Sequence, residues 1–278
     1  MKSVLKRLIQ WVISGVPNKV VNATIVQAAP NKRLQGVSAL ITGGGKGIGL
    51  SIAQKCVAEG ASVIICGRTE SVLQEASSKM GNIPYLVFDV RDISSFDTIF
   101  EKAESLIGSP INALVNNAGI SLHEQSFLDV TEAGYDNQFL TNLKGPYFLT
   151  QSFIKYIKKK HISSSNTLFI SSERGFYCDT IPYGLTKIAL NSLVQGLSCR
   201  YIDKGFRFNA IAPGVTVSGM TNLSSNDNLY RERSYGRRVF LPEEIAETAV
   251  FLLSDSSQCI SGEIIPCNHG SHLKNDYK

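Results

Sequence analysis

The chain has 278 residues, of which 43% are hydrophobic and 18% charged, and its formal net charge is +5 at pH 7. These values are typical of a folded protein and exclude a wholly disordered chain, and the length allows one large α/β domain or two small ones. The basic excess does not indicate nucleic-acid binding: residues 1–35 carry six Lys or Arg and no acidic residue, so the rest of the chain has a net charge of −1.

Residues 1–35 are a basic N-terminal extension that is partly amphipathic. Apolar residues in its first part share one helical face, while Lys2, Lys6 and Arg7 lie mostly on the other. Gln10 interrupts the apolar run, which is too short for a signal peptide. The pattern fits contact with a membrane surface, but packing on its own domain or on a second subunit is favoured.

From residue 37 onward, short apolar runs alternate with longer amphipathic ones. The pattern predicts strands at 37–41, 61–66, 85–88, 113–115, 167–170, 206–211 and 264–266. It predicts helices at 48–59, 70–79, 97–106, 183–201 and 243–253, with helical stretches from the fourth strand to residue 156. Continuous apolar runs indicate strands buried on both faces. We therefore expect a single doubly wound, Rossmann-like α/β domain at 36–270, with a parallel sheet covered by helices on both faces, and a C-terminal tail at 271–278.

A glycine-rich turn follows the first predicted strand and opens the first helix. It reads Thr42-Gly43-Gly44-Gly45-Lys46-Gly47-Ile48-Gly49. Glycines let the backbone adopt positive φ and approach a pyrophosphate, and the N–H groups that begin the helix then face the anion. This position in the chain predicts a dinucleotide-binding turn.

Four motifs in sequence order resemble those of the short-chain dehydrogenase/reductase family. They are T-G-x-x-x-G-x-G in the glycine turn, Asn116-Asn117-Ala118-Gly119, Tyr183-x-x-x-Lys187 and Pro213-Gly214. The resemblance covers about 36–270 and implies a nicotinamide cofactor, a homodimer or homotetramer, and a carbonyl or alcohol substrate. The cofactor-binding residues that it implies, with those suggested by charge, are Thr42, Gly43, Gly45, Lys46, Gly47, Ile48, Gly49, Arg68, Asp89, Val90, Asn116, Ala118, Gly119, Tyr183, Lys187, Pro213, Gly214, Val215 and Ser218.

The end of the second predicted strand indicates which nicotinamide is bound. An acidic side chain there would bind the ribose 2′-hydroxyl and repel a 2′-phosphate. This chain has Gly67 in that position, followed by Arg68, and Lys46 lies in the glycine turn. Both cations could instead be solvated surface charges, but together with the missing acid they favour NADP(H).

Tyr183 and Lys187 are four residues apart and share one face of a predicted helix. A phenol can donate a proton to the oxygen of a carbonyl that accepts a hydride, and a nearby ammonium is expected to lower the pKa of the phenol. The family resemblance implies that Ser172 binds the substrate oxygen and that Asn142 supports a proton-relay water. Because the segment from Ser172 to Tyr183 is about two residues shorter than the common family spacing, Ser171 remains an alternative to Ser172.

These residues predict an NADP(H)-dependent oxidoreductase acting on a carbonyl or secondary alcohol of a small or medium organic substrate, with Tyr183 as general acid and base. Residues 220–240 are expected to cover that substrate. The alternative is a catalytically silent NADP(H)-binding scaffold or sensor. The histidines show no metal-ligand spacing, so no metal is expected. The cysteines are scattered and include no C-x-x-C pair, which predicts that the protein is located in the reducing cytoplasm.

Overall fold

The computed structural model describes residues 32–221, 229–231 and 236–273. The N-terminal extension as far as residue 31, part of the expected substrate cover and the last five residues of the tail lie outside the described residues. Within those residues, no helix is long and apolar enough to cross a membrane.

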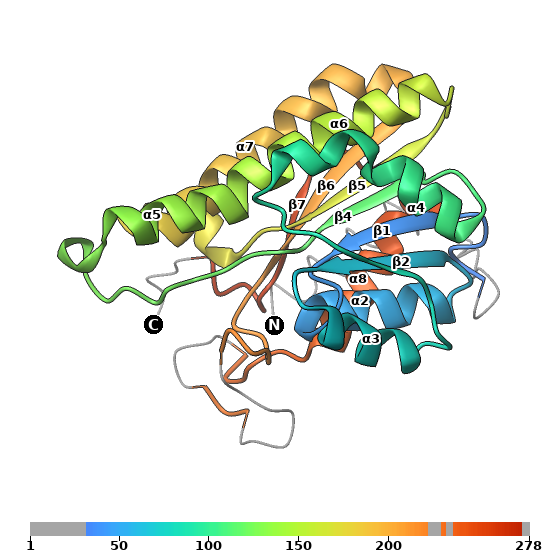
Figure 1. The fold of residues 1–278 in the computed structure, drawn as a ribbon. Helices are drawn as coiled ribbons and strands as arrows, with labels where there is room; N and C mark the ends of the chain where they lie inside the picture. Colours follow the sequence, from blue (N-terminus) through green and yellow to red (C-terminus); the bar gives the residue numbers. More distant parts are fainter. Residues whose placement is uncertain (1–31, 222–228, 232–235, 274–278) are drawn as a thin grey trace, which may run out of the picture.

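Seven parallel strands form one sheet in the order β3-β2-β1-β4-β5-β6-β7 (Figure 1). The strands are β1 (Ser38–Thr42), β2 (Ser62–Gly67), β3 (Tyr85–Val87), β4 (Ala113–Asn116), β5 (Ser165–Ile170), β6 (Phe206–Pro213) and β7 (Ile264–Cys267). The chain starts at β1, winds outward to β3, and then returns to the other side of β1 with β4. In sheets of this kind the ligand crevice lies beyond the carboxyl ends of the strands where the order reverses, here between β1 and β4.

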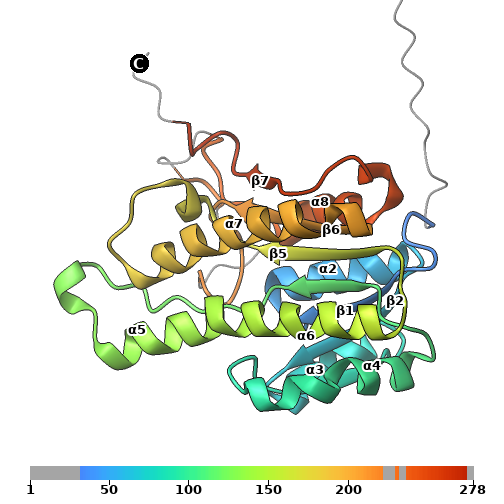
Figure 2. The ribbon, with the colours of Figure 1, turned by 90° about the horizontal axis from the view of Figure 1, so that it is seen from above.

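Helices cover both faces of the sheet. One face packs against α2 (Gly47–Ala58), α3 (Glu70–Ser78) and α8 (Pro242–Leu253). The other packs against α4 (Ile99–Ile107), α6 (Gly145–Lys159) and α7 (Pro182–Tyr201). A π-helical turn at Leu140–Lys144 joins α5 (Glu132–Phe139) to α6, and the two helices run alongside α7 (Figures 1 and 2).

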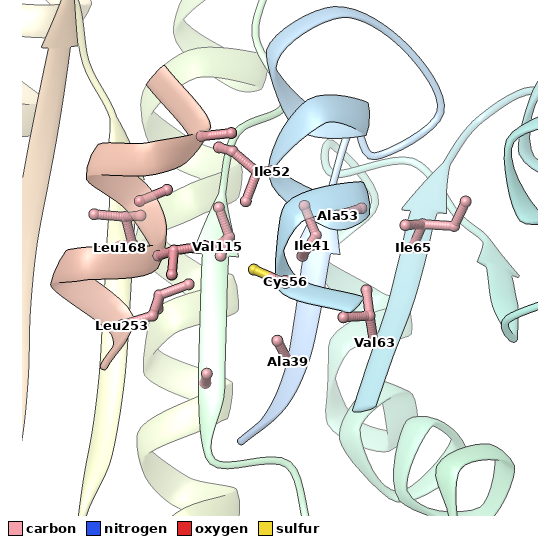
Figure 3. Close-up of a cluster of buried hydrophobic side chains, with 14 of the residues drawn as sticks. Ala39, Ile41, Ile52, Ala53, Cys56, Val63, Ile65, Val115, Leu168 and Leu253 are labelled. Atoms are coloured by element: carbon pink, nitrogen blue, oxygen red, sulfur yellow. The ribbon is translucent and has the colours of Figure 1, made fainter. Parts of the chain in front are cut away.

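The core beneath α2 shows why the apolar runs become buried strands. Figure 3 shows Ile52 and Cys56 of α2 close to Ile41 of β1, with Val115 on the neighbouring strand. All five residues of β1 are buried, because the strand is central and covered on both faces. This packing holds the carboxyl end of β1, where the glycine turn starts, against the first turn of α2.

The predicted fold class is confirmed, with modest differences at the boundaries. Most helices and strands begin or end within two residues of the expected positions. The packed region extends slightly past 36–270: Leu34 is fully buried, Arg33 pairs with Glu59, and Tyr177 donates to the Ser271 carbonyl over 2.8 Å. Short terminal segments like these lack periodicity, so only their tertiary contacts reveal that they belong to the domain.

Candidate active site

The glycine turn has the backbone that its sequence predicts. Gly43 and Gly47 have φ values of 64° and 55°, in the region that favours glycine. At Gly49 a Cβ atom would collide with the Gly43 carbonyl and with the Asn117 side chain. These glycines therefore allow the turn to fold back on the start of α2 and leave its N–H groups uncovered.

Asn117 ties this turn to the end of β4. Its Nδ2 donates to the carbonyls of Thr42, over 2.9 Å, and Gly43, over 3.1 Å. In return, Thr42 Oγ1 accepts from the N–H groups of Asn117 and Ala118, over 3.0 and 3.1 Å. The sequence prediction named Asn116 instead, but that side chain is buried and donates to Thr150 Oγ1 over 3.0 Å. The strand alternation places Asn116 in the core and Asn117 at the turn.

A cleft runs from this turn across the ends of β2, β3 and β4. Of the residues predicted to bind a cofactor, those that line it are Thr42, Gly43, Gly45, Lys46, Arg68, Asp89, Val90, Ala118 and Gly119. It is also lined by residues that the prediction did not include as cofactor ligands: Cys66, Gly67, Thr69, Val72, Leu73, Phe88, Ile120 and Thr141. Cys66 and Gly67 end β2, Phe88 directly follows β3 and Thr69 precedes α3, and these positions at strand ends and a helix start could have identified them.

The charges of the cleft are concentrated at the end of β2. Lys46 and Arg68 are exposed, and neither makes an ion pair within the described part of the chain. A Cβ atom at Gly67 would meet only the Leu73 side chain, at an ordinary 3.4 Å. Packing therefore does not require glycine there. The Asp89 carboxylate is bound by the Arg91 guanidinium, whose hydrogen bonds hold the pKa of Asp89 below its usual value.

The cleft fits a dinucleotide. The close backbone approach at the glycine turn leaves no side chain where a pyrophosphate would lie, and two unpaired cations flank the end of β2. Thr141 is 7% exposed, and its buried Oγ1 has no hydrogen-bond partner among the described residues. Buried polar groups normally have partners, so a ligand hydroxyl or amide is a natural one.

Lys187 lies one turn along α7 from Tyr183 and is 4% exposed. Its Nζ donates to the Ile170 carbonyl over 2.7 Å and lies 5.6 Å from the centroid of the Tyr183 ring. Burial lowers the pKa of Lys187 to about 8. The side chain is thus held at the carboxyl end of β5 by a hydrogen bond that does not depend on a ligand.

The structure brings Ser172, and not Ser171, to Tyr183. The Ser172 hydroxyl lies near that of Tyr183 and lowers its pKa, whereas Ser171 Oγ donates to Asn191 Oδ1 over 2.6 Å. Burial raises the pKa of Tyr183, and the Ser172 hydroxyl and the Arg174 charge oppose that rise. Lys187 is not among the groups that shift this pKa here, and its Nζ donates to the Ile170 carbonyl; the expectation that it lowers the pKa of Tyr183 stays a prediction.

Asn142 lies in the π-helical turn between α5 and α6. Its amide forms a paired contact with the backbone of Ile120: Oδ1 accepts from the N–H and Nδ2 donates to the carbonyl, each over 2.8 Å. A Cβ atom at Gly119 would lie 3.3 Å from Asn142 Oδ1 and 3.8 Å from Lys187 Nζ. Asn142 therefore holds the segment after β4 close to Lys187, and π-helical turns of this kind are frequent at functional sites.

The segment after β6 closes the far side of the site. It begins with Pro213 at the end of the strand, and the N–H of Gly214 donates to Cys267 over 3.0 Å. Val215 accepts from the Phe240 N–H over 2.9 Å. A Cβ atom at Gly47 would lie 3.4 Å from the Ser218 side chain, so this segment returns to the glycine turn. Ile48 lies in the first turn of α2, beside the same contact.

Comparisons with known proteins agree with this geometry. A family model described as enoyl-(acyl carrier protein) reductase matches residues 43–272. A tropinone reductase homologue of Arabidopsis thaliana is 32% identical over 253 residues, covering 88% of this chain and 96% of the relative. The 3-oxoacyl-[acyl-carrier-protein] reductase FabG of Aquifex aeolicus is 32% identical over 248 residues, covering 86% and 98%. A putative short-chain alcohol dehydrogenase from Sinorhizobium meliloti, of known structure, has a TM-score of 0.78 and 31% identity, covering 87% and 98%.

Proposed function

The chain belongs to the short-chain dehydrogenase/reductase family of nicotinamide-dependent oxidoreductases, and we propose that it is an NADP(H)-dependent enzyme that reduces a ketone, or oxidises the corresponding secondary alcohol, in a small or medium organic molecule. The observation that carries this proposal is the grouping of Ser172, Tyr183 and the buried Lys187, whose Nζ lies 5.6 Å from the centroid of the Tyr183 ring, next to the glycine-turn cleft. The relatives described as tropinone and 3-oxoacyl reductases support a ketone as the reacting group.

In the proposed reaction the nicotinamide supplies or accepts the hydride. The hydroxyls of Ser172 and Tyr183 bind the substrate oxygen, and Tyr183 Oη gives it a proton during reduction. A raised pKa suits this role, because the phenol stays protonated at neutral pH. Lys187 holds its Nζ next to this pair, and Asn142 fixes the neighbouring backbone at Ile120.

Three residues at one end of the cleft support NADP(H) over NAD(H). Lys46 and Arg68 provide two cations without ion-pair partners in the described residues, and Gly67 provides no carboxylate. A 2′-phosphate placed there would meet two positive charges, and the arginine can bind it with two parallel hydrogen bonds.

The function is tested by following NADPH oxidation with a panel of ketones and 3-oxoacyl thioesters. Tyr183→Phe keeps the ring and removes the proton donor, so we expect turnover to fall by roughly 10²- to 10⁴-fold while NADPH still binds. Tyr201→Phe, at the other end of α7, is the matched control and should retain activity. If the unaltered chain binds NADPH but reduces none of the panel, the silent scaffold or sensor becomes the better interpretation.

We also propose that two copies of the chain associate through α5, α6 and α7. A groove between these helices is lined mainly by apolar side chains; Tyr147, which lines it, is 46% exposed, and Ile188, next to the lining residue Ala189, is 36% exposed. Light scattering should give a dimer or tetramer, and Tyr147→Glu should shift the chain towards the monomer.

The six cysteines of the chain are all free, as is typical of proteins in the reducing cytoplasm. We therefore propose the cytoplasm as the location of the protein, which a fluorescent fusion would test.

A further inference from the structure

The loop that joins Ser172 to Tyr183 contains a close ion pair. The Arg174 guanidinium donates two hydrogen bonds to the Asp179 carboxylate, from Nε and Nη2, each over 2.6 Å. The Asp179 side chain is only 5% exposed, while that of Arg174 is 42% exposed. A two-point contact of this kind fixes the relative orientation of its partners as well as their separation.

Each partner of the pair also bonds to one end of the loop. The Arg174 N–H donates to Ser172 Oγ over 3.3 Å, so this serine oxygen accepts from the loop and keeps its own proton available. At the other end, the Ile181 N–H donates to Asp179 Oδ1 over 2.9 Å, directly before α7 begins at Pro182. A chain of contacts therefore runs from Ser172 through Arg174 and Asp179 to the residues that start the helix of Tyr183.

Gly184 shows how closely this loop lies on α7. A Cβ atom at this position would collide with the Asp179 carboxylate. The absence of a side chain next to Tyr183 thus allows Asp179 to occupy the first turn of the helix, where a carboxylate interacts favourably with the helix dipole. The contact does not depend on the backbone of Gly184, whose φ is not positive.

We propose that the Arg174–Asp179 ion pair is a positioning element that fixes the loop between Ser172 and Tyr183 and so holds these two hydroxyls at their mutual distance. This proposal rests on the function proposed above, because the hydroxyls of Ser172 and Tyr183 are the groups assigned there to bind the substrate oxygen. Neither Arg174 nor Asp179 lines the dinucleotide cleft, and both lie in the loop between the two reacting hydroxyls.

The charges around Tyr183 support this assignment. Arg174 lowers the pKa of Tyr183, whereas Glu173 raises it; the Glu173 carboxylate accepts from Asn268 Nδ2 over 3.3 Å, and the charges of Arg231, His272 and Arg174 lower its own pKa. Lys187 is the other cation near the ring. Because Arg174 is the charged group that opposes the effect of burial, moving it should change the acidity of Tyr183.

The test measures Tyr183 directly, without a substrate. The chain is labelled with [¹³Cζ]tyrosine, saturated with NADP⁺ and titrated by NMR, and the Tyr183 signal is assigned by its loss in Tyr183→Phe. Arg174→Gln should raise the Tyr183 midpoint by roughly half a pH unit or more, and Arg174→Lys, which keeps the charge, should raise it less. Arg200→Gln, an exposed arginine near the end of α7, is the matched control and should leave the midpoint unchanged.

Asp179→Asn separates positioning from simple charge. Removing a negative charge alone would lower the midpoint, whereas releasing Arg174 and the Ser172 contact should raise it. Gly184→Ala displaces Asp179 while retaining both charges, and should also raise the midpoint. An unchanged midpoint in Arg174→Gln, or a lower one in Asp179→Asn, overturns the proposal; thermal melts identify any variant that has lost its fold.

Activity provides a second readout. With a ketone that the unaltered chain reduces, Arg174→Gln and Asp179→Asn should lower kcat about tenfold or more and leave the KM for NADPH within about twofold. Arg174→Lys, which keeps the positive charge, should lower kcat less than Arg174→Gln does. If no ketone is reduced, the proposed function fails while the NMR titration still decides the role of the ion pair.

Discussion

Gly67→Asp should reverse the cofactor preference of this chain. Gly67 ends β2, lines the cleft beside Arg68, and has only the Leu73 side chain, at 3.4 Å, near the position of a Cβ atom. Its φ is not positive, so an aspartate fits without strain. The new carboxylate would accept a hydrogen bond from the ribose 2′-hydroxyl of NADH and would repel the 2′-phosphate of NADPH.

The size of this effect follows from the exposure of the site. A phosphate charge of about −1.5 to −2 at about 5 Å from the carboxylate, in a solvent-like dielectric, costs about 1.5 kcal/mol, or roughly a tenfold weaker binding of NADPH. A hydrogen bond to the 2′-hydroxyl adds about 1 kcal/mol in favour of NADH. We therefore expect the NADPH/NADH affinity ratio to fall by about two orders of magnitude in low salt, and by less in high salt because the site is exposed.

Titration of nicotinamide fluorescence with NADPH and NADH measures this ratio. Gly67→Ala is the control, since it adds the Cβ atom without the charge and should leave the ratio within about twofold. Arg68→Ala should weaken NADPH binding and spare NADH. If the unaltered chain binds both cofactors equally, or if Gly67→Asp and Gly67→Ala behave alike, the electrostatic explanation of NADP(H) selectivity is wrong.

Two further predictions concern stability. The pKa of Lys187 falls from 10.5 in an unfolded chain to about 8 in the folded one, so the unfolded state binds more protons between these two pH values. The free energy of unfolding should therefore rise with pH across that window, by up to ~3 kcal/mol. Chemical denaturation should show this rise, and Lys187→Met should lack it and be more stable at pH 7. Asn117→Ala leaves the carbonyls of Thr42 and Gly43 without a donor, which should cost about 1–3 kcal/mol of unfolding free energy and weaken NADPH binding; an unchanged melting temperature would show that water replaces the amide.

The motifs predicted the fold and most of the glycine-turn geometry, because both depend on local pattern. Alternating apolar runs specify buried parallel strands wherever they occur, and glycines at Gly43 and Gly47 are required by the φ values that the turn adopts. The motifs could not decide which of the two serines after β5, Ser171 or Ser172, lies next to Tyr183. Ser171 and Ser172 are chemically identical neighbours, and only the position of α7 decides that one bonds to Asn191 and the other lies near Tyr183.

The sequence by itself thus determined which residue types meet at the carboxyl edge of the sheet, since strand order and motif order place them there. The tertiary structure decided how they act on one another. Burial lowers the pKa of Lys187 and raises that of Tyr183, and Ser172 and Arg174 oppose the rise at Tyr183. Desolvation and hydrogen-bond direction depend on the groups packed around a side chain, most of which are distant in sequence, and spacing along one helix does not contain them.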